Sequence, residues 1–547
     1  MQRVGLRYRS KRAKAHYDVI VVGSGIGGLA CAALLAKLGR SVCVLEQHYT
    51  AGGFTHAYER NGYEWDVGVH YIGEMNKPQA PLRRLFDVIS DGRIEWAPMD
   101  EVYDRIVIGD RHYDFHTGRE QFAAGLKARF PDEARAIDRY VALVRKVTGA
   151  SQTFFMGQAL PPLMSNLYQH LRDWLVPREC LMPTRTVLES LTGNQELIGV
   201  LTGQWGDYGM VPADAPFLMH ALVVKHYFGG GFYPVGGAQK IAEHIAPVIR
   251  AAGGEVFTYA RVQEIKIERG RATGVVLENG DCLRAGCVVS DAGALNTFGT
   301  LLPEAQRRQY GYDRLLRKVR PSSAHLCLYV GLKGSVETLG LPRTNLWVYP
   351  SAHHERNVQT YLQNPDAEFP MVYISFPSAK DPGWSGQHPD RSTVEVLSLG
   401  PYDGFEPWAG TDWNDRGAEY EAHKAQLAQR LLQVLYQQMP QLEGAVDYYE
   451  LSTPLSTQWF QLNAHGEIYG LEHDTARFRQ NWLRATTRVK GLYLTGQDVV
   501  TAGVGGALVA GMLTTMAILG TDFWKVSRLL KQWQAPAGRA AVALATV

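Results

Sequence analysis

Two glycine-rich turns, one near each end of the 547-residue chain, carry residues that can bind a phosphorylated cofactor. In the first turn, Gly23, Gly25 and Gly28 fit the spacing G-x-G-x-x-G, with Gly27 between the last two. The first glycine allows a tight turn, the second lets the backbone approach a pyrophosphate, and the third lets a helix pack closely on a strand. The N-terminus of that helix then offers free N–H groups and a positive dipole end to the phosphates.

A carboxylate follows the first turn at the distance expected of a ribose-binding residue. Glu46 comes 18 residues after Gly28, at the end of a short apolar segment. A carboxylate at this place accepts hydrogen bonds from a ribose diol, and its charge disfavours a 2′-phosphate. The pair Gly52-Gly53 comes shortly afterwards and can bring more backbone against the pyrophosphate.

The second turn favours FAD over NAD. Residues 491–495 predict a strand that leads to Gly496 and Asp498, and Gly505 belongs to the glycine-rich start of an uncharged helix. Asp498 is placed to accept hydrogen bonds from sugar or ribityl hydroxyls. The N-terminus of the helix is placed to face the edge of the flavin that gains negative charge on reduction. A ligand held from both ends of the chain is an extended one, as FAD is.

The elements around these turns alternate as in a parallel α/β sheet. Residues 17–22 form a β-branched run typical of a buried strand, and Gly39 ends the helix that starts near Leu29. A second group of elements in the middle of the chain joins the same sheet. It comprises a helix over 239–252 and strands over 254–259, 261–268, 272–278 and 288–290, while the strand over 41–45 belongs to the first group and ends at Glu46.

The predicted fold class is therefore α/β, with a Rossmann-type FAD-binding domain assembled from discontinuous segments. A substrate domain of mixed sheet and helices completes it. The FAD-binding domain comprises residues 17–99, 225–299 and 485–521, and the substrate domain residues 100–224 and 300–484. Residues 1–16 are a basic N-terminal arm, and residues 522–547 an amphipathic helix with a tail.

Composition narrows the range of partners. Lys and Arg number 56 against 54 Asp and Glu, so the net charge of +2 does not indicate nucleic acid binding. The six cysteines are scattered, and no His or Cys cluster has metal-ligand spacing, which favours reduced thiols in a cytoplasmic protein. No second strand–GxGxxG–helix occurs. Electrons therefore have to pass through the flavin's own cavity, to or from a quinone, oxygen or a transiently bound NAD(P)H.

Three segments have features of sequences that span or touch a membrane. Residues 501–520 carry no charge and are long enough to span one, but the glycine turn before them favours a buried helix of the FAD-binding domain. Residues 147–171 are also uncharged but are broken by Pro161-Pro162, which indicates either a buried helical layer or a membrane-touching lid. Residues 523–533 are basic and amphipathic, suited to the domain surface or a membrane interface.

The N-terminal arm leaves two interpretations open as well. It carries six Lys and Arg residues and no acid before Asp18, which suits a solvated tail or a contact with anionic lipid headgroups. No apolar run follows that could serve as a secretory signal. The expected location is cytoplasmic, with peripheral contact at the inner face of the membrane as the further interpretation.

Three segments carry a family resemblance: IVVGSGIGGLACAALLAKLGRSVCVLEQH, AGGFTHAYERNGYEWDVGVHYIG and LYLTGQDVVTAGVGGAL. They resemble retinol saturases and bacterial phytoene-desaturase-like and carotenoid-isomerase-like flavoproteins. The resemblance implies a two-domain fold of the amine-oxidase type, non-covalent FAD and an apolar substrate channel that ends at the flavin. It also implies that Gly23, Gly25, Gly28 and Glu46 hold the ADP half. Val262 would contact adenine through its backbone, and Asp498 would lie near the ribityl and pyrophosphate.

The resemblance also points to the reacting residues. His70 and Tyr71 follow a strand whose equivalent in similar proteins lies beside the isoalloxazine, so they are the candidates for exchanging a proton with the substrate. His70 packing on the flavin edge without proton transfer is the alternative. His465, Tyr469 and His473 come shortly before the second turn and can line the cavity or belong to a surface loop.

The leading hypothesis is an FAD-dependent oxidoreductase that transfers hydride at flavin N5 to or from carbon–carbon double bonds of a hydrophobic molecule. Retinoids, carotenoids and unsaturated fatty acyl chains are the substrate classes considered, with saturation, desaturation or isomerisation as the reaction. One alternative is an oxidase of C–N bonds, because amine oxidases share the cofactor motifs. A second is a lipid-binding escort protein without catalysis.

Overall fold

The largest sheet forms around the first glycine turn. In the computed structural model, which describes residues 3–160 and 162–534, β2 (His16–Val22) lies between β3 (Val42–Leu45) and β14 (Cys282–Ser290) and is parallel to both. The strand order is β1-β11-β3-β2-β14-β13-β12, and β20 (Leu492–Leu494) also pairs with β14. Both glycine turns therefore follow strands of one sheet. The outer members are β1 (Leu6–Arg7), β11 (Glu255–Thr258), β12 (Val262–Glu268) and β13 (Arg271–Leu277).

Three helices cover this sheet: α1 (Ile26–Lys37), α10 (Gln239–Ala251) and α21 (Gly503–Leu519). α1 is buried along nearly its whole length, which explains why the sequence of this helix is apolar all round. α21 approaches α1 closely, because a Cβ on Gly511 would lie 2.8 Å from the Cβ of Ala30.

The uncharged segment 501–520 therefore packs on the cofactor-binding sheet, as predicted, but on one face. Residues Gly503–Asp522 are long and apolar enough to cross a membrane, and 28% of that helix is buried. A single helix of this kind is weak evidence for a span, because core helices of soluble proteins pass the same test.

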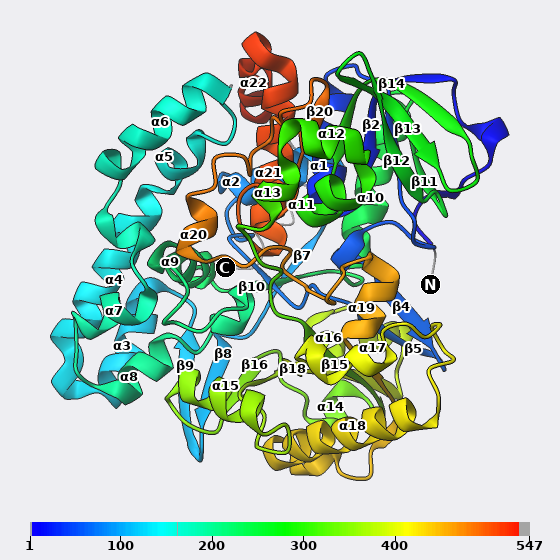
Figure 1. The fold of residues 1–547 in the computed structure, drawn as a ribbon. Helices are drawn as coiled ribbons and strands as arrows, with labels where there is room; N and C mark the ends of the chain where they lie inside the picture. Colours follow the sequence, from blue (N-terminus) through cyan, green and yellow to red (C-terminus); the bar gives the residue numbers. More distant parts are fainter. Residues whose placement is uncertain (1–2, 161, 535–547) are drawn as a thin grey trace.

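A second sheet lies below the first in Figure 1, with α18 (Ala418–Gln438) across its outer face. Its order is β19-β15-β18-β17-β16-β8-β9. These strands are β8 (Val102–Ile108), β9 (Arg111–His116), β15 (His325–Lys333), β16 (Asn345–Tyr349), β17 (Val372–Ser375), β18 (Arg391–Leu399) and β19 (Val446–Ser452). A small sheet, β6 (Ile72–Gly73), β10 (Gly231–Pro234) and β7 (Trp96–Pro98), is the third.

The strands of the second sheet come from both segments that were assigned to the substrate domain, but one hairpin crosses the predicted division. β4 (Ala57–Arg60) and β5 (Tyr63–Asp66) precede residue 100, yet Trp65 Nε1 donates a 3.1 Å hydrogen bond to the Val330 carbonyl of β15. The domain boundaries themselves remain a prediction.

A layer of helices flanks both sheets on the left of Figure 1. It includes α3 (Arg119–Arg129), α4 (Ala134–Gly149), α5 (Ser151–Met156), α6 (Pro162–Leu175), α7 (Thr184–Glu189), α8 (Gln195–Leu201) and α9 (Phe217–Tyr227). α6 does not belong to a buried layer, since Met164, Leu167, Leu171 and Trp174 are more than half exposed, Trp174 at 91%. A buried layer therefore describes only the first part of this segment, where Phe154 and Phe155 are buried, and the membrane-touching lid remains a prediction for α6.

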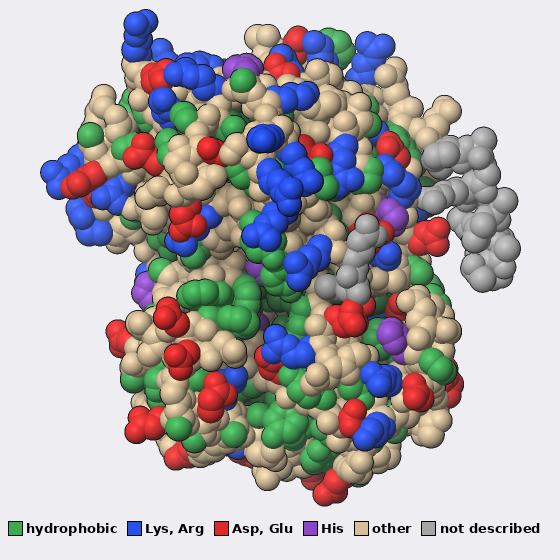
Figure 2. All heavy atoms as spheres, turned by 90° about the vertical axis from the view of Figure 1, so that its right-hand side faces the viewer, with side chains coloured by type: hydrophobic (Ala, Val, Ile, Leu, Met, Phe, Trp, Pro, Cys, Tyr) green, Lys and Arg blue, Asp and Glu red, His purple; other side chains and the backbone are tan. Residues whose placement is uncertain are grey.

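The N-terminal arm is ordered from residue 3 onward and adds β1 to the edge of the large sheet. Leu6 and Arg7 pair in parallel with Phe257 and Thr258 of β11, and Val4 is 6% exposed. Figure 2, which looks onto this side, shows Lys and Arg side chains gathered on the upper half. The solvated-tail interpretation is therefore wrong. Six Lys and Arg residues with no acid before Asp18 suggested a free tail, but backbone pairing with an open sheet edge stabilises the arm.

Candidate functional site

The two glycine turns meet at the wall of a large cavity. Gly23 has φ +95°, in the left-handed region that favours glycine. A Cβ on Gly28 would lie 2.7 Å from the Gly23 carbonyl oxygen, and one on Gly27 would lie 2.8 Å from Gly496 Cα. The two turns thus approach each other closely, with the Asp291 carboxyl group beside both, since a Cβ on Gly27 or Gly496 would lie within 2.8 Å of Asp291 Oδ1.

The cavity, of about 1750 Å³, is continuous from these turns to the second sheet. Most drug-sized ligands occupy about 300–1,000 Å³, so it has room for an extended cofactor and a second molecule. All but one of the predicted cofactor residues line it, and Gly28 lies behind them, packing α1 on β2. The lining residues are Gly23, Gly25, Gly27, Glu46, Gly52, Gly53, Val262, Gly496, Asp498 and Gly505.

Glu46 organises the first turn as well as facing the cavity. Its Oε2 accepts hydrogen bonds from Ser24 N at 2.9 Å and Ser24 Oγ at 2.6 Å, and its Oε1 accepts one from His48 N at 2.8 Å. A carboxylate has about four lone-pair sites, so one acceptor site remains for a ribose hydroxyl.

Asp498 joins three segments at the second turn. It is 2% exposed, and its two oxygens accept hydrogen bonds from Ala294 N at 2.7 Å and Leu471 N at 2.9 Å. The carboxylate therefore both orders the loops and lines the cavity, so the structural and the ligand-binding interpretations of Asp498 are compatible.

Asp291, at the end of β14, was not among the predicted site residues. Its carboxyl accepts hydrogen bonds from the backbone N–H groups of Gly25 and Gly28, at the N-terminus of α1. Burial raises the pKa of Asp291 to about 7. The helix end that is predicted to bind phosphate thus has an acid beside it that can be neutral.

His70 lines the cavity at the second sheet. Its Nδ1 lies 2.7 Å from Glu395 Oε2 on β18, and its carbonyl accepts a 3.0 Å hydrogen bond from Lys380 Nζ at the end of α16 (Pro377–Lys380). Burial lowers the pKa of His70 to about 3 and raises the pKa of Glu395 to about 8. A protonated Glu395 would donate to Nδ1 and leave Nε2–H as the free donor of His70.

Tyr71 lies beside it among aromatic rings. Its ring stacks on Tyr227 of α9, with centroids 4.2 Å apart and planes at 6°, and Tyr373 of β17 is 6.4 Å away. The Tyr71 hydroxyl contacts two carboxyl groups, at 2.9 Å from Asp104 Oδ2 and 3.1 Å from Asp207 Oδ2. Sequence reasoning selected Tyr71 but missed both acids, because they come from β8 and from a short helix far along the chain.

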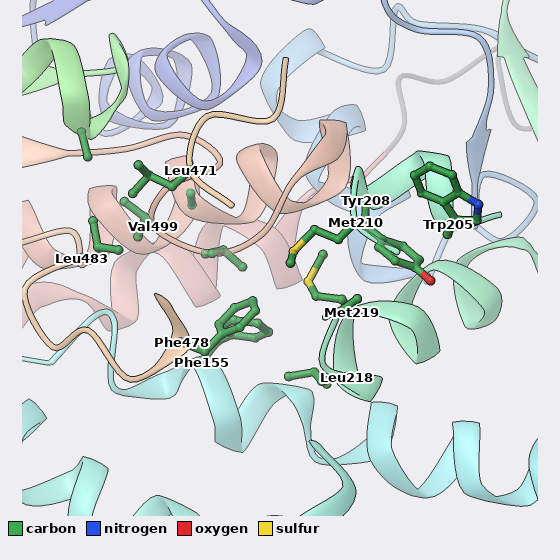
Figure 3. Close-up of a cluster of buried hydrophobic side chains, with 14 of the residues drawn as sticks. Phe155, Trp205, Tyr208, Met210, Leu218, Met219, Leu471, Phe478, Leu483 and Val499 are labelled. Atoms are coloured by element: carbon green, nitrogen blue, oxygen red, sulfur yellow. The ribbon is translucent and has the colours of Figure 1, made fainter. Parts of the chain in front are cut away.

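The remaining wall of the cavity is apolar. Figure 3 shows Phe155 of α5 beside Phe478, with Met219 of α9 directed toward them. Phe155, Met219 and Met164 line the cavity, and so do Met512 and Met516 on the face of α21 that is turned away from α1. Tyr469 also lines it, whereas His465 and His473 do not.

Comparison with known proteins agrees with this arrangement. A family profile described as "NAD(P)-binding Rossmann-like domain" matches residues 21–89. Human all-trans-retinol 13,14-reductase is 38% identical over 528 residues, which cover 93% of this chain and 86% of the relative. The chain belongs to the all-trans-retinol 13,14-reductase family. The chain therefore has an oxidoreductase-type flavoprotein fold with a Rossmann-like domain, as the sequence motifs predicted.

Two proteins more distantly related to the all-trans-retinol 13,14-reductase family are also similar to this chain. Prolycopene isomerase of Daucus carota is 26% identical, over 90% of this chain and 79% of the relative. The solved structure of cyclohexylamine oxidase from Brevibacterium oxydans superposes with a TM-score of 0.58 at 16% identity, over 94% of this chain and 99% of that one. This likeness confirms the amine-oxidase-type fold.

Proposed function

We propose that this protein is an FAD-dependent oxidoreductase acting on carbon–carbon double bonds of a hydrophobic polyene, a retinoid or a carotenoid. The observation that carries the proposal is the single cavity that joins two glycine turns to a wall of aromatic and apolar side chains. Family membership supports the substrate class, since the relatives are named for retinol reduction and prolycopene isomerisation. A nucleotide end and an apolar end in one cavity suit a redox cofactor next to a lipid.

The residues present fit FAD. The backbone of Gly23, Gly25 and Gly27, with the N-terminus of α1, would hold the pyrophosphate, and Gly52-Gly53 would add to it. Glu46 would bind the ribose with its remaining acceptor site. Val262, the first residue of β12, would contact adenine through its backbone. Gly496, Asp498 and Gly505 would bind the ribityl and flavin part, with the N-terminus of α21 beside it.

A bound flavin supplies or accepts a hydride at N5. The chain's own residues bind and orient the polyene between aromatic rings and exclude water from it. We propose that His70 and Tyr71, both on the cavity wall, belong to the part of the site where the proton that accompanies the hydride is exchanged. Within the described residues we find no second nucleotide-binding turn, so a quinone, oxygen or transient NAD(P)H would reach the flavin through the same cavity.

An anaerobic visible spectrum tests the function. The yellow purified protein is reduced with dithionite, and all-trans-retinol, a carotenoid, an unsaturated fatty acid and a primary amine are added separately. Return of the yellow colour with one polyene supports saturation. Bleaching of the oxidised protein by a polyene supports desaturation, and a changed polyene geometry without a net colour change supports isomerisation.

Two outcomes would overturn the proposal. Bleaching of the oxidised protein by the amine alone, with peroxide formed on exposure to air, would show an oxidase of C–N bonds. A colourless protein that takes up no added FAD but binds polyenes would show an escort protein.

We further propose that the protein contacts a membrane surface at the cavity mouth, from the cytoplasmic face. Met164 of α6 lines the cavity, and the same helix exposes Leu167, Leu171 and Trp174. Phe523, which is 54% exposed, lines the cavity beside α22 (Trp524–Gln532), whose last turn carries Lys531. The tail 535–547 lies outside the described residues. A lipid substrate could then pass from the bilayer into the cavity without crossing water.

Vesicle co-sedimentation tests this contact. Replacing Leu167, Leu171 and Trp174 by serine should release the protein from anionic vesicles, because the interfacial apolar area is lost. Leu362→Ser is the matched control, since Leu362 is 55% exposed on a different helix, α15 (His354–Gln363). Equal binding of the triple variant and the wild type would contradict the contact.

A further inference from the structure

We infer that Asp207 is the proton donor to the polyene, and that Tyr71 and Asp104 hold its carboxyl group in the protonated form. This assignment rests on the proposed function and names a catalytic residue for it. Asp207 belongs to the short helix η5 (Trp205–Tyr208), and Asp104 to β8.

One hydroxyl group links the two acids. Tyr71 Oη lies 2.9 Å from Asp104 Oδ2 and 3.1 Å from Asp207 Oδ2. A phenol has a single proton and can donate to one of these oxygens at a time. The second contact is a hydrogen bond only if the other carboxyl is protonated and donates to Tyr71 Oη. The geometry therefore calls for one carboxylate and one carboxylic acid.

The surroundings decide which acid carries the proton. Asp104 is fully buried and accepts hydrogen bonds from Asn345 Nδ2 at 2.8 Å and Gln204 Nε2 at 2.7 Å as well as from Tyr71. Three donors stabilise an ionised carboxylate. Among residues 3–160 and 162–534, Tyr71 is the one side-chain partner of the Asp207 carboxyl. Burial and the neighbouring Asp104 raise the pKa of Asp207 well above its usual value.

Asp207 is also the acid that reaches the cavity. Asp207 and Tyr71 line the cavity, whereas Asp104 stands behind them. Trp347 and Tyr373 line the same part, so the medium around the acid is poor in water. The Tyr469 hydroxyl donates a 3.0 Å hydrogen bond to the Gly206 carbonyl and fixes the backbone beside Asp207.

His70 is less suited to the same task. The pKa of His70, lowered by burial to about 3, keeps its ring neutral, and its Nδ1 is engaged by Glu395. A neutral imidazole N–H is a far weaker acid than a carboxylic acid. Orientation of the substrate or the flavin edge is the role that remains for His70.

The reduction balances with this donor. One alkene carbon gains a hydride, with two electrons, from the reduced flavin, which is thereby oxidised. The neighbouring carbon gains the proton of Asp207, whose O–H turns from Tyr71 Oη toward the cavity for this step. The two electrons of the C=C π bond form this second C–H bond, and a C–C single bond remains. The Asp207 carboxylate then accepts the Tyr71 hydrogen bond until a proton from water restores the acid.

Glu395 is the neighbouring group that could compete as an acid, since burial raises its pKa to about 8. Its Oε2 lies 2.7 Å from His70 Nδ1, and Glu395 does not line the cavity, so it does not present a proton to the substrate. Lys380, beside Asp104, is the cation that faces this site. The pKa values of the surrounding phenols are raised, mainly by burial, so these groups stay neutral. They are Tyr103, Tyr208, Tyr227, Tyr349, Tyr373 and Tyr469.

The test compares wild type, Asp207→Asn and, as a matched control, Asp114→Asn, which changes an acid on β9 paired with Arg105. The first readout is independent of activity. Glu395, with a pKa of about 8, and Asp291, with a pKa of about 7, are expected to give protonated-carboxyl carbonyl bands of their own near neutral pH. The infrared difference spectrum of the flavin-free protein, wild type minus Asp207→Asn, should therefore show one further carbonyl band, which Asp114→Asn retains. The second readout is anaerobic reoxidation of the reduced flavin by the polyene, followed against pH.

We expect Asp207→Asn to slow reoxidation by about 10²–10⁴-fold, the usual contribution of a general acid. Reoxidation by an artificial acceptor should be unchanged, the wild-type fall in rate at high pH should disappear, and formic acid should restore part of the rate. A variant that keeps the wild-type rate and pH profile, or the carbonyl band, would overturn the assignment. If wild type itself is not reoxidised by any polyene, the proposed function fails instead, and the infrared band alone reports on the protonation of Asp207.

Discussion

The carboxyl group of Asp291 accepts a hydrogen bond from the backbone N–H of Gly28, at the N-terminus of the helix that begins the cofactor site. The contact is close, because a Cβ on neighbouring Gly25 would lie 2.6 Å from Asp291 Oδ2. An ionised Asp291 would repel a pyrophosphate at this helix end, whereas a neutral one would not. Its pKa of about 7, raised by burial, places the change within the physiological range.

FAD affinity should therefore depend on pH through Asp291. We expect the dissociation constant of the wild type to rise above pH 7, by at most about tenfold per pH unit, because binding favours the protonated acid. Asp291→Asn should bind FAD with little pH dependence, as measured by fluorescence titration between pH 6 and 9. Asp114→Asn serves as control, and a wild-type curve as flat as that of Asp291→Asn would contradict the prediction.

Gly27→Ala should weaken flavin binding and leave the fold intact. The new Cβ would lie 2.8 Å from both N and Cα of Gly496, and backbone atoms of a tight turn cannot move aside. We expect at least a tenfold weaker FAD affinity. Gly386→Ala is the matched control, since no heavy atom lies within 4 Å of its added Cβ. A yellow Gly27→Ala protein with wild-type affinity would show that the two turns separate readily.

Tyr71→Phe should lower the rate of polyene-dependent flavin reoxidation by about 10–100-fold, because the link between Asp104 and Asp207 is lost. The ring still stacks on Tyr227, so the melting temperature should change by only a few degrees. Tyr103→Phe is the comparison, since within the described chain the buried Tyr103 hydroxyl has no hydrogen-bond partner. Equal rates for the two variants would remove Tyr71 from the mechanism.

Burial of a neutral His220 is expected to make the folded protein less stable in acid. Its Nε2 lies 2.8 Å from Tyr140 Oη, and burial lowers its pKa to about 3 from 6.5. Because the folded pKa lies below the unfolded one, this contribution is present above pH 6.5 and is lost as pH falls toward 3. The free energy of unfolding of wild type relative to His220→Gln should therefore shrink by up to about 1.4 kcal/mol per pH unit in that window. The free energies are measured by urea unfolding between pH 4 and pH 7. A difference between wild type and His220→Gln that stays constant over this range would be inconsistent with a neutral buried ring.

The cofactor half of the molecule could be predicted because its signals are local. A strand, a glycine turn, a helix and Glu46 follow one another within 30 residues, and each has its own sequence pattern. The carboxyl groups at the second sheet have no such local sequence pattern. Asp104, Asp207 and Glu395 come from β8, η5 and β18, and only the packing of the second sheet brings them beside His70 and Tyr71.

One wrong interpretation, the solvated arm, and one alternative left open, the segment that contains α6, have a physical cause as well. The basic arm looked like a tail because charge is visible in sequence, whereas an open sheet edge that can pair with it is not. α6 has the periodicity of a buried helix, but Leu171 and Trp174 face outward, and sequence alone does not distinguish a core from a lipid surface.

Pairing of β1 with β11 has a consequence for handling the protein. Without the arm, β11 would be a bare outer strand whose free N–H and C=O groups can pair with another chain, which is a common route to precipitation. Val4 N also donates a 3.0 Å hydrogen bond to Thr50 Oγ1, just before Gly52-Gly53. Shortening the chain at this end would therefore reduce solubility and loosen the loop beside the pyrophosphate, so affinity tags belong at the other terminus.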